Sequence, residues 1–225
     1  PEMSRGLGDV YKRQDQEKAF DRVDRNLLWS VLDEYGVQGQ LLDNIRALYK
    51  ICQSAVRTAH GLTNWFKNTT GVRQGCVLSP LLFITYMNKI TTMAYQDPYT
   101  HTLNELLFAD DQSLIYPNEQ ELQQHINTLN ENCRQYNMKI NIEKTEVMTI
   151  SKMPITTTVY VENSKIRQVN EFKYLGSYFT EDGKFDREIE ARIQKANAVT
   201  YQLSPLLRHP SISMNTKLQL LSLIH

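Results

Sequence analysis

The chain has 225 residues, of which 41% are hydrophobic and 22% are charged, and this is the composition of an ordinary folded domain. It excludes the collagen-like and intrinsically disordered classes. The 25 basic and 25 acidic side chains give a net charge of zero, which argues against nucleic-acid binding because phosphate contacts normally need a basic excess.

Helical periodicity dominates the first part of the chain that can be assigned. Apolar residues recur at helical spacing over residues 24–37 and 39–51, and Gly36 provides a stop between these two helices. Residues 54–72 contain β-branched side chains and a turn at Gly61, which predicts a short hairpin.

The middle of the chain predicts a helix, a hairpin and a second helix. Ser79 as N-cap and Pro80 at the first helical position begin a buried helix. Residues 103–116, LNELLFADDQSLIY, form two apolar stretches around an acidic turn, which is typical of a β-hairpin, although ADDQ is not an optimal tight turn. An amphipathic helix over 118–138 should bury one stripe, consisting of Leu122, Ile126, Leu129 and Cys133.

Short strands follow, and a helical segment closes the chain. Strand patterns occur at 147–150, 156–163 and 172–179, and helical periodicity returns at 187–208. Mixed helices and antiparallel strands of this kind predict an α+β fold.

Three aspartates indicate the chemistry. Asp15 begins the stretch DQEKAFD, and Asp110 and Asp111 are adjacent at the tip of the predicted hairpin. Neighbouring carboxylates repel each other unless a cation holds them, and two divalent ions on such carboxylates can drive an in-line phosphoryl transfer. The alternative from this motif alone is a solvated acidic turn.

Five motifs together resemble the palm of reverse transcriptases, most closely those of non-LTR, LINE-type retrotransposons. They occur in the family's order and spacing, namely DQEKAFDRVD, GVRQGCVLSPLLF, LLFADD, NMKINIEKTEVM and FKYLGSYF. The resemblance implies a right-hand polymerase palm, an antiparallel sheet with flanking helices, followed by the start of a helical thumb. Its function would be RNA-directed DNA synthesis, and its partners would be template RNA, a DNA primer and deoxynucleoside triphosphates.

The resemblance also implies roles for the catalytic residues. Asp15, Asp110 and Asp111 would hold two Mg²⁺ ions, with Mn²⁺ as a substitute. Lys144 matches the family's lysine near the leaving pyrophosphate, where a cation would neutralise charge or donate a proton. The alternative for Lys144 is an exposed structural lysine.

Three residues match the family's nucleotide-binding positions. Phe20 matches the bulky residue that crowds a ribose 2′-hydroxyl and selects deoxynucleotides, although from spacing alone it is equally a core aromatic. Gln74 and Gly75 lie in GVRQG, whose glycines allow close backbone approach to the template base and nucleotide. Viral RNA-copying polymerases resemble this palm but typically carry a polar residue near Phe20 and GDD at the hairpin.

The ends of the chain do not fit the family. An apolar strand and a fingers region should precede Asp15, but RGLGDVYKRQ occupies that place. DVYKRQ is one reading of gatgtgtataagagacag and LSLIH is one reading of ctgtctcttatacac, which are opposite strands of a transposase adapter end. We therefore expect a non-native leader at 1–14, a palm at 15–179, a thumb-like region at 180–220 and a non-native tail at 221–225. With its fingers missing, this chain should be inactive alone.

The remaining expectations concern location and an alternative function. The three cysteines lack ligand-like spacing and should be reduced thiols, with no structural zinc. No signal peptide or transmembrane segment is predicted, so we expect an intracellular protein, cytoplasmic or nuclear, without a membrane partner. The alternative function is a polymerase-derived nucleic-acid-binding module without catalysis.

Overall fold

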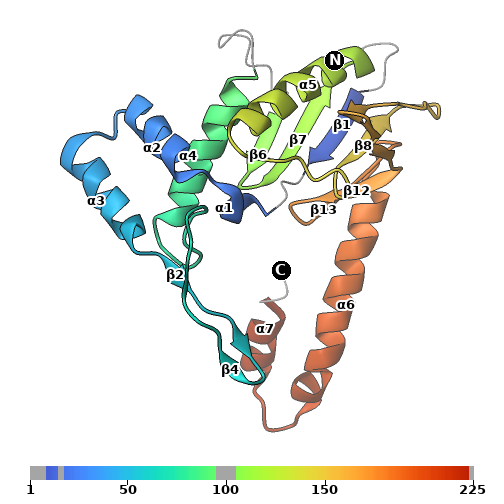
Figure 1. Cartoon of the computed structure of the whole chain (residues 1–225). Coiled ribbons are helices and arrows are strands. Elements are labelled where there is room, and N and C mark those ends of the chain that lie inside the picture. Colours follow the sequence, from blue (N-terminus) through green and yellow to red (C-terminus); the bar gives the residue numbers. More distant parts are fainter. Residues whose placement is uncertain (1–8, 15–17, 95–104, 223–225) are drawn as a thin grey trace.

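A five-stranded sheet forms the centre of this computed structural model, which describes residues 9–14, 18–94 and 105–222 (Figure 1). Its strand order is β11-β8-β1-β7-β6. These strands are β1 (Asp9–Gln14), β6 (Glu105–Phe108), β7 (Asp111–Tyr116), β8 (Glu146–Ile150) and β11 (Arg167–Gln168). All neighbours pair antiparallel except β11, which runs parallel to β8. The mixed architecture agrees with the predicted α+β class.

The strand β1 lies in the middle of this sheet, where no strand was expected. Val10 pairs with Tyr116 of β7 on one side and with Thr149 of β8 on the other. The polar sequence DVYKRQ gives little strand signal, but two neighbouring strands supply hydrogen-bond partners on both sides, and such context overrides propensity. A strand therefore does lead to Asp15, which itself lies outside the described residues.

One long helix packs against the sheet. α5 (Glu119–Gln135) contacts β7 and begins at the N-cap Asn118, whose side chain accepts a hydrogen bond from the Glu121 amide at 2.9 Å. The four residues of its predicted stripe are fully buried, and they are Leu122, Ile126, Leu129 and Cys133. This prediction is confirmed.

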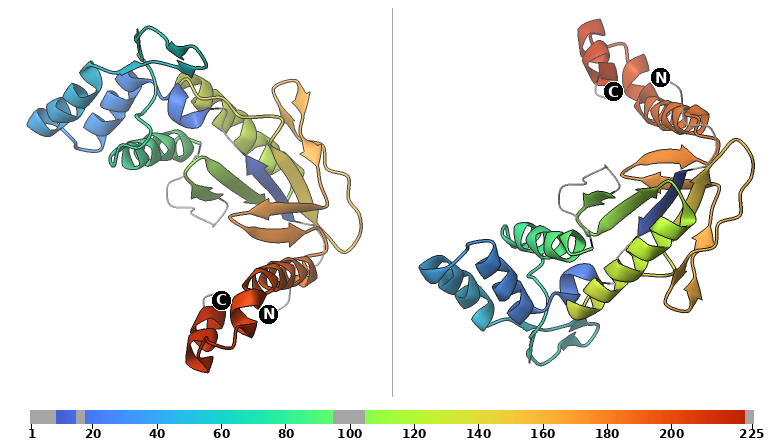
Figure 2. Two further views of the ribbon diagram at one scale, coloured as in Figure 1. Left: turned by 90° about the horizontal axis from the view of Figure 1, so that it is seen from below. Right: turned by 90° about the horizontal axis from the view of Figure 1, so that it is seen from above.

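Four further helices form a layer beside the sheet (Figure 2). They are α1 (Ala19–Arg22), α2 (Arg25–Glu34), α3 (Gly39–Lys50) and α4 (Ser79–Thr92). The helix predicted at Ser79 exists, but its N-cap is Leu78 and Ser79 is its first residue. Ser79 is buried, and its hydroxyl lies 3.2 Å from the hydroxyl of Tyr49, so it bonds across to α3 instead of capping.

A two-stranded ribbon, residues 52–68, projects from this helical layer (Figures 1 and 2). It consists of β2 (Gln53–Ser54), β3 (Arg57–Thr58), β4 (Gly61–Leu62) and β5 (Phe66–Lys67), with β2 paired to β5 and β3 to β4. Thr58 pairs with Gly61, whose φ of +118° suits glycine. The predicted hairpin with a turn at Gly61 is confirmed.

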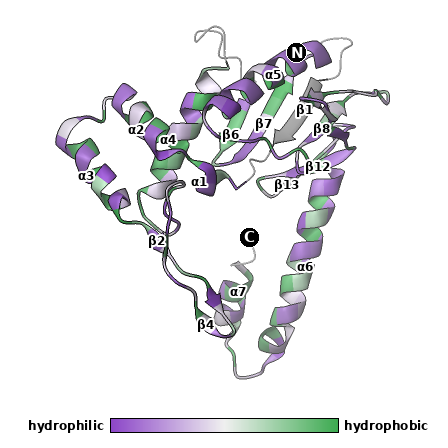
Figure 3. Cartoon of the chain, viewed as in Figure 1, coloured by the Kyte–Doolittle hydropathy of each residue, from purple (hydrophilic) through white to green (hydrophobic). Residues whose placement is uncertain are grey.

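The last part of the chain forms two small hairpins and two helices. These elements are β9 (Tyr160–Val161), β10 (Ser164–Lys165), β12 (Glu171–Tyr174), β13 (Ser177–Thr180), α6 (Asp186–Arg208) and α7 (Met214–Ser222). The helix α6 extends away from the sheet and mixes hydrophilic with hydrophobic residues along its length (Figure 3). Within the described ranges, no helix combines the length and apolar character that a bilayer-crossing segment needs.

Candidate functional site

The acidic pair lies at a tight hairpin tip. Phe108 pairs with Asp111, so Ala109 and Asp110 form a two-residue loop between β6 and β7. Ala109 has a φ of +53°, a left-handed conformation that costs a residue with a Cβ roughly 1–2 kcal/mol. Asp110 and Asp111 are both half-buried. The sheet therefore holds two neighbouring carboxyl groups at one end of its strands, in and directly after a strained turn.

The register of the sheet brings other predicted residues toward the same end of the strands. Arg13 pairs with Ser113 on one side and with Glu146 on the other. Because adjacent strands are about 4.8 Å apart, the start of β7 and the start of β8 lie about 10 Å apart across β1. Lys144 comes two residues before Glu146 in an exposed turn, so it lies at the Asp111 end of the sheet.

Aspartate oxygens are the ligands that Mg²⁺ prefers, and the acidic pair supplies two carboxyl groups on adjacent residues. Among residues 9–14, 18–94 and 105–222, no three His, Cys, Asp or Glu side chains are grouped closely enough to hold a metal ion. The third predicted ligand, Asp15, is outside those ranges and follows Gln14, which pairs with Gln112. The donor set fits a divalent cation only if Asp15 contributes.

The three predicted nucleotide-binding residues meet in one shallow cleft of about 460 Å³. Phe20, Gln74 and Gly75 all line it. Phe20 is half-buried and stacks on Phe83 with ring centroids 4.3 Å apart, as its alternative interpretation as a core aromatic requires. One face of Phe20 thus packs on the core while the residue still borders the cleft, and its role as a steric gate stays a prediction.

Cys76 also lines this cleft, three residues before α4 begins at Ser79. A hydrogen bond from the backbone of Leu78 lowers the pKa of the Cys76 thiol, burial opposes it, and Ser79 and Arg73 lower it further. These donors therefore stabilise negative charge on the Cys76 sulfur itself.

Arg25 is a positioning residue that sequence reasoning missed. Its guanidinium donates to the carbonyls of Asn68, Thr70 and Gly71 at 2.6, 3.0 and 2.9 Å. It also lies 5.1 Å from the ring centre of Tyr49. These bonds fix the loop that leads into Gln74 and Gly75. The carbonyls are 43 to 46 residues away in sequence, so no local pattern indicated the contact.

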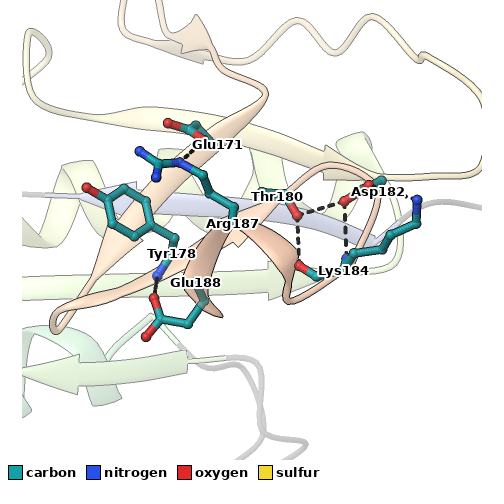
Figure 4. A network of polar contacts seen from close by, with 7 residues as sticks. All are labelled: Glu171, Tyr178, Thr180, Asp182, Lys184, Arg187 and Glu188. Carbon is teal, nitrogen blue, oxygen red and sulfur yellow. Dashed lines mark hydrogen bonds and ion pairs between the residues drawn. The ribbon is translucent and has the colours of Figure 1, made fainter. Parts of the chain in front are cut away.

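The hairpin β12–β13 is tied to the start of α6 (Figure 4). Tyr178 donates its backbone N–H to the Glu188 carboxylate at 2.7 Å, and this bond, with Arg192, holds the pKa of Glu188 below its usual range. Arg187 lies 4.4 Å from the Tyr178 ring centre and bonds Glu171 at 3.1 Å. Two independent contacts therefore set the angle at which α6 leaves the hairpin.

A comparison with protein families identifies the family to which this domain belongs. Residues 6–179 match the family model described as "Reverse transcriptase (RNA-dependent DNA polymerase)". The chain belongs to the reverse transcriptase family. The matched range of this reverse transcriptase domain contains the sheet, the acidic hairpin and the cleft at Phe20.

Named relatives of the domain include a transposon protein and a polyprotein of a retrotransposable element. It is 28% identical over 217 residues to the probable RNA-directed DNA polymerase from transposon BS of Drosophila melanogaster, covering 88% of this chain and 23% of the relative. It is 22% identical over 215 residues to the Pol polyprotein of the R2 element of Nasonia vitripennis, covering 89% and 21% respectively. The expected LINE-type reverse transcriptase is confirmed, and the chain spans less than a quarter of the length of these relatives.

Solved telomerase structures share the fold. Apo telomerase from Candida tropicalis superimposes with a TM-score of 0.61 at 15% identity, over 97% of this chain and 41% of the telomerase chain. A telomerase from the same organism, in complex with a fragment of telomeric RNA, gives a TM-score of 0.58 at 17% identity, over 99% and 38%. At these identities the likeness concerns the fold alone.

Proposed function

We propose that the parent of this chain is a LINE-type RNA-directed DNA polymerase that uses two-metal nucleotidyl transfer. Asp15, Asp110 and Asp111 would hold two Mg²⁺ ions, which activate the primer 3′-hydroxyl and stabilise charge on the leaving pyrophosphate. The observation that supports this proposal most is the pairing of Gln14 with Gln112. It brings the chain to the acidic hairpin one residue before Asp15.

The surrounding residues would bind and orient the substrates. Phe20 would exclude a ribose 2′-hydroxyl, and Gln74 with Gly75 would meet the nucleotide and the template base. Lys144 would approach the pyrophosphate, where its ammonium group offsets negative charge. Template RNA, a DNA primer and deoxynucleoside triphosphates are the proposed partners.

We assign residues 15–179 to a palm and residues 180–220 to the start of a thumb. The strand β1 (Asp9–Gln14) precedes this palm in sequence but pairs within its sheet. The polar stretch before Asp15 would hold that residue less firmly than the apolar strand that the resemblance implies. Small errors in the position of reacting groups have large effects on in-line transfer. We therefore propose that this chain alone does not extend a primer.

The test is primer extension by the longer polypeptide encoded at the parent locus, sequenced by long reads without transposase adapters. With an RNA template, a DNA primer and Mg²⁺, we expect DNA synthesis that Asp110→Asn reduces to background. Lys152→Gln, an exposed change away from the hairpin, should leave synthesis unchanged. RNA binding without synthesis would instead support a non-catalytic binding module, and a locus that encodes both ends as written would refute the adapter interpretation.

A further inference from the structure

The distribution of charge along the chain is uneven although its sum is zero. No Asp or Glu occurs between Asp43 and Asp97, while this stretch contains six Lys or Arg residues. Two of these are compensated from outside, because Arg46 lies 3.8 Å from Asp43 and Lys89 lies 2.6 Å from Glu34. The remaining four are exposed and make no ion pair within the described ranges, and they are Lys50, Arg57, Lys67 and Arg73.

The ribbon, residues 52–68, carries two of these cations together with large apolar side chains. Four of its hydrophobic residues are exposed by about half of their surface or more, namely Val56 at 52%, Leu62 at 62%, Trp65 at 66% and Phe66 at 49%. None of its residues is buried. A two-stranded ribbon with no core is marginal in water, and an exposed apolar group of this kind marks a binding surface.

A cleft lies at the base of the ribbon and widens this surface. Its volume is about 680 Å³, and its lining includes Phe66, Lys67 and Arg73. Asp21 also lines it and accepts a hydrogen bond from Gln74 at 3.4 Å. Part of the hydrogen-bonding capacity of Arg73 is already used, since its guanidinium donates to the Leu48 carbonyl at 3.3 Å. An aromatic ring and an uncompensated lysine are therefore adjacent along one wall.

We infer that the ribbon and this cleft bind a single strand of nucleic acid, without sequence preference. Exposed aromatic rings stack on bases that a duplex would hide, and cations that lack carboxylate partners attract phosphates. Trp65 and Phe66 supply the rings, while Arg57 and Lys67 supply the charges. An apolar protein partner would cover the rings, but it would leave unpaired the Lys and Arg side chains of this stretch, which contains no Asp or Glu.

This inference deepens the proposed function, because it names the surface that would hold the strand before it reaches the cleft at Phe20. It rests on that function only in taking nucleic acid as the substrate. The measurement below involves no metal ion, no nucleotide and no synthesis. Its failure is therefore distinguishable from the failure of the catalytic proposal.

The experiment measures the binding of the complete 225-residue chain to a fluorescein-labelled 15-residue oligouridylate by anisotropy, over a series of salt concentrations. Trp65→Ala should weaken binding on the order of 10-fold through the loss of base stacking. The double variant Arg57→Glu, Lys67→Glu should flatten the slope of log affinity against log salt by about 0.7 for each lost phosphate contact. Far-ultraviolet circular dichroism checks that each variant keeps the native secondary structure.

Matched controls remove the same side-chain types elsewhere. Tyr201→Ala removes an aromatic that is 82% exposed on α6, and Lys152→Glu reverses an exposed charge beyond β8. Both should bind as the native chain does. Absent binding, or equal binding by native and ribbon variants, overturns the inference. So does self-association that Trp65→Ala abolishes without a change in RNA affinity, because the ribbon would then be a protein interface.

Discussion

The hairpin β6–β7 and the ribbon are both short antiparallel pairs, but they differ in what surrounds them. Leu114 of β7 is fully buried beneath α5, and β7 pairs with β1 on its other side. Among the residues that the structure describes, the ribbon has a strand neighbour on neither side, and none of its own side chains is buried. The proposed metal chemistry, which depends on fixed distances, would lie on the supported hairpin, whereas the ribbon's exposed surface suits the proposed partner, a strand that varies in sequence.

The largest expected effect comes from truncating a leucine in each pair. Leu114→Ala should lower the free energy of unfolding by about 2–5 kcal/mol, because it leaves a cavity beneath α5. Leu62→Ala, at a residue 62% exposed on the ribbon, should change it by less than about 0.5 kcal/mol. Urea denaturation measures both. Similar losses would mean that the ribbon packs as part of the core and would remove the contrast.

The junction between the ribbon and the helical layer provides the second test. Gly71 has a φ of +80°, and a Cβ there would lie 3.0 Å from backbone atoms of Phe20 and Asp21. Gly71→Ala should cost about 2–3 kcal/mol, combining left-handed strain with this clash.

Gly75 is the matched control, because it has a φ of +79° and nothing within 4 Å of its Cβ position. Gly75→Ala should cost only about 1 kcal/mol from conformation. Thermal unfolding compares the two variants. Equal losses would show that the contact of Gly71 with the Phe20 segment contributes nothing to stability.

The smallest effect depends on pH. Burial, with smaller contributions from the charges of Glu105 and Glu121, raises the pKa of Tyr116 on β7 to about 12. A raised folded-state pKa means that the contribution to stability is complete below pH 10 and is lost as pH rises through 12. At pH 11 this loss is about 1 kcal/mol.

Tyr116→Phe should therefore flatten the decline of stability between pH 10 and 12, measured by urea denaturation at each pH. Tyr201→Phe removes an exposed hydroxyl from α6 and should leave the decline as it is. An identical decline in the Tyr116→Phe variant would contradict the assignment of this pH dependence to the supported sheet.

Local sequence patterns predicted those helices and turns that are determined by residues close together in the sequence. The buried stripe of α5, the turn at Gly61 and the acidic hairpin all follow from periodicity or from turn residues. Ser79 was misassigned as a cap because its partner, Tyr49, is 30 residues away. β1 was missed for the same reason, since its residues pair with residues 98 to 141 positions later.

The candidate site divides along the same line. Motif resemblance selected Phe20, Gln74 and Gly75, and the structure brings them to one cleft. Arg25 has no such motif signal, because its three acceptors are backbone carbonyls whose positions depend on the folded loop. A single sequence does not indicate residues like this one, which act by contacting backbone atoms far away in the sequence.

The central place of β1 has a consequence for how the chain folds. Val10 must wait for Thr149, 139 residues further along, before its second ladder can form. At about 5–20 residues per second, a ribosome needs on the order of 10 s to supply that partner. During this time β1 has been synthesised but has no hydrogen-bond partner on that side. Chaperones that hold nascent chains should therefore affect the yield of folded domain more strongly than the stability of the folded state affects it.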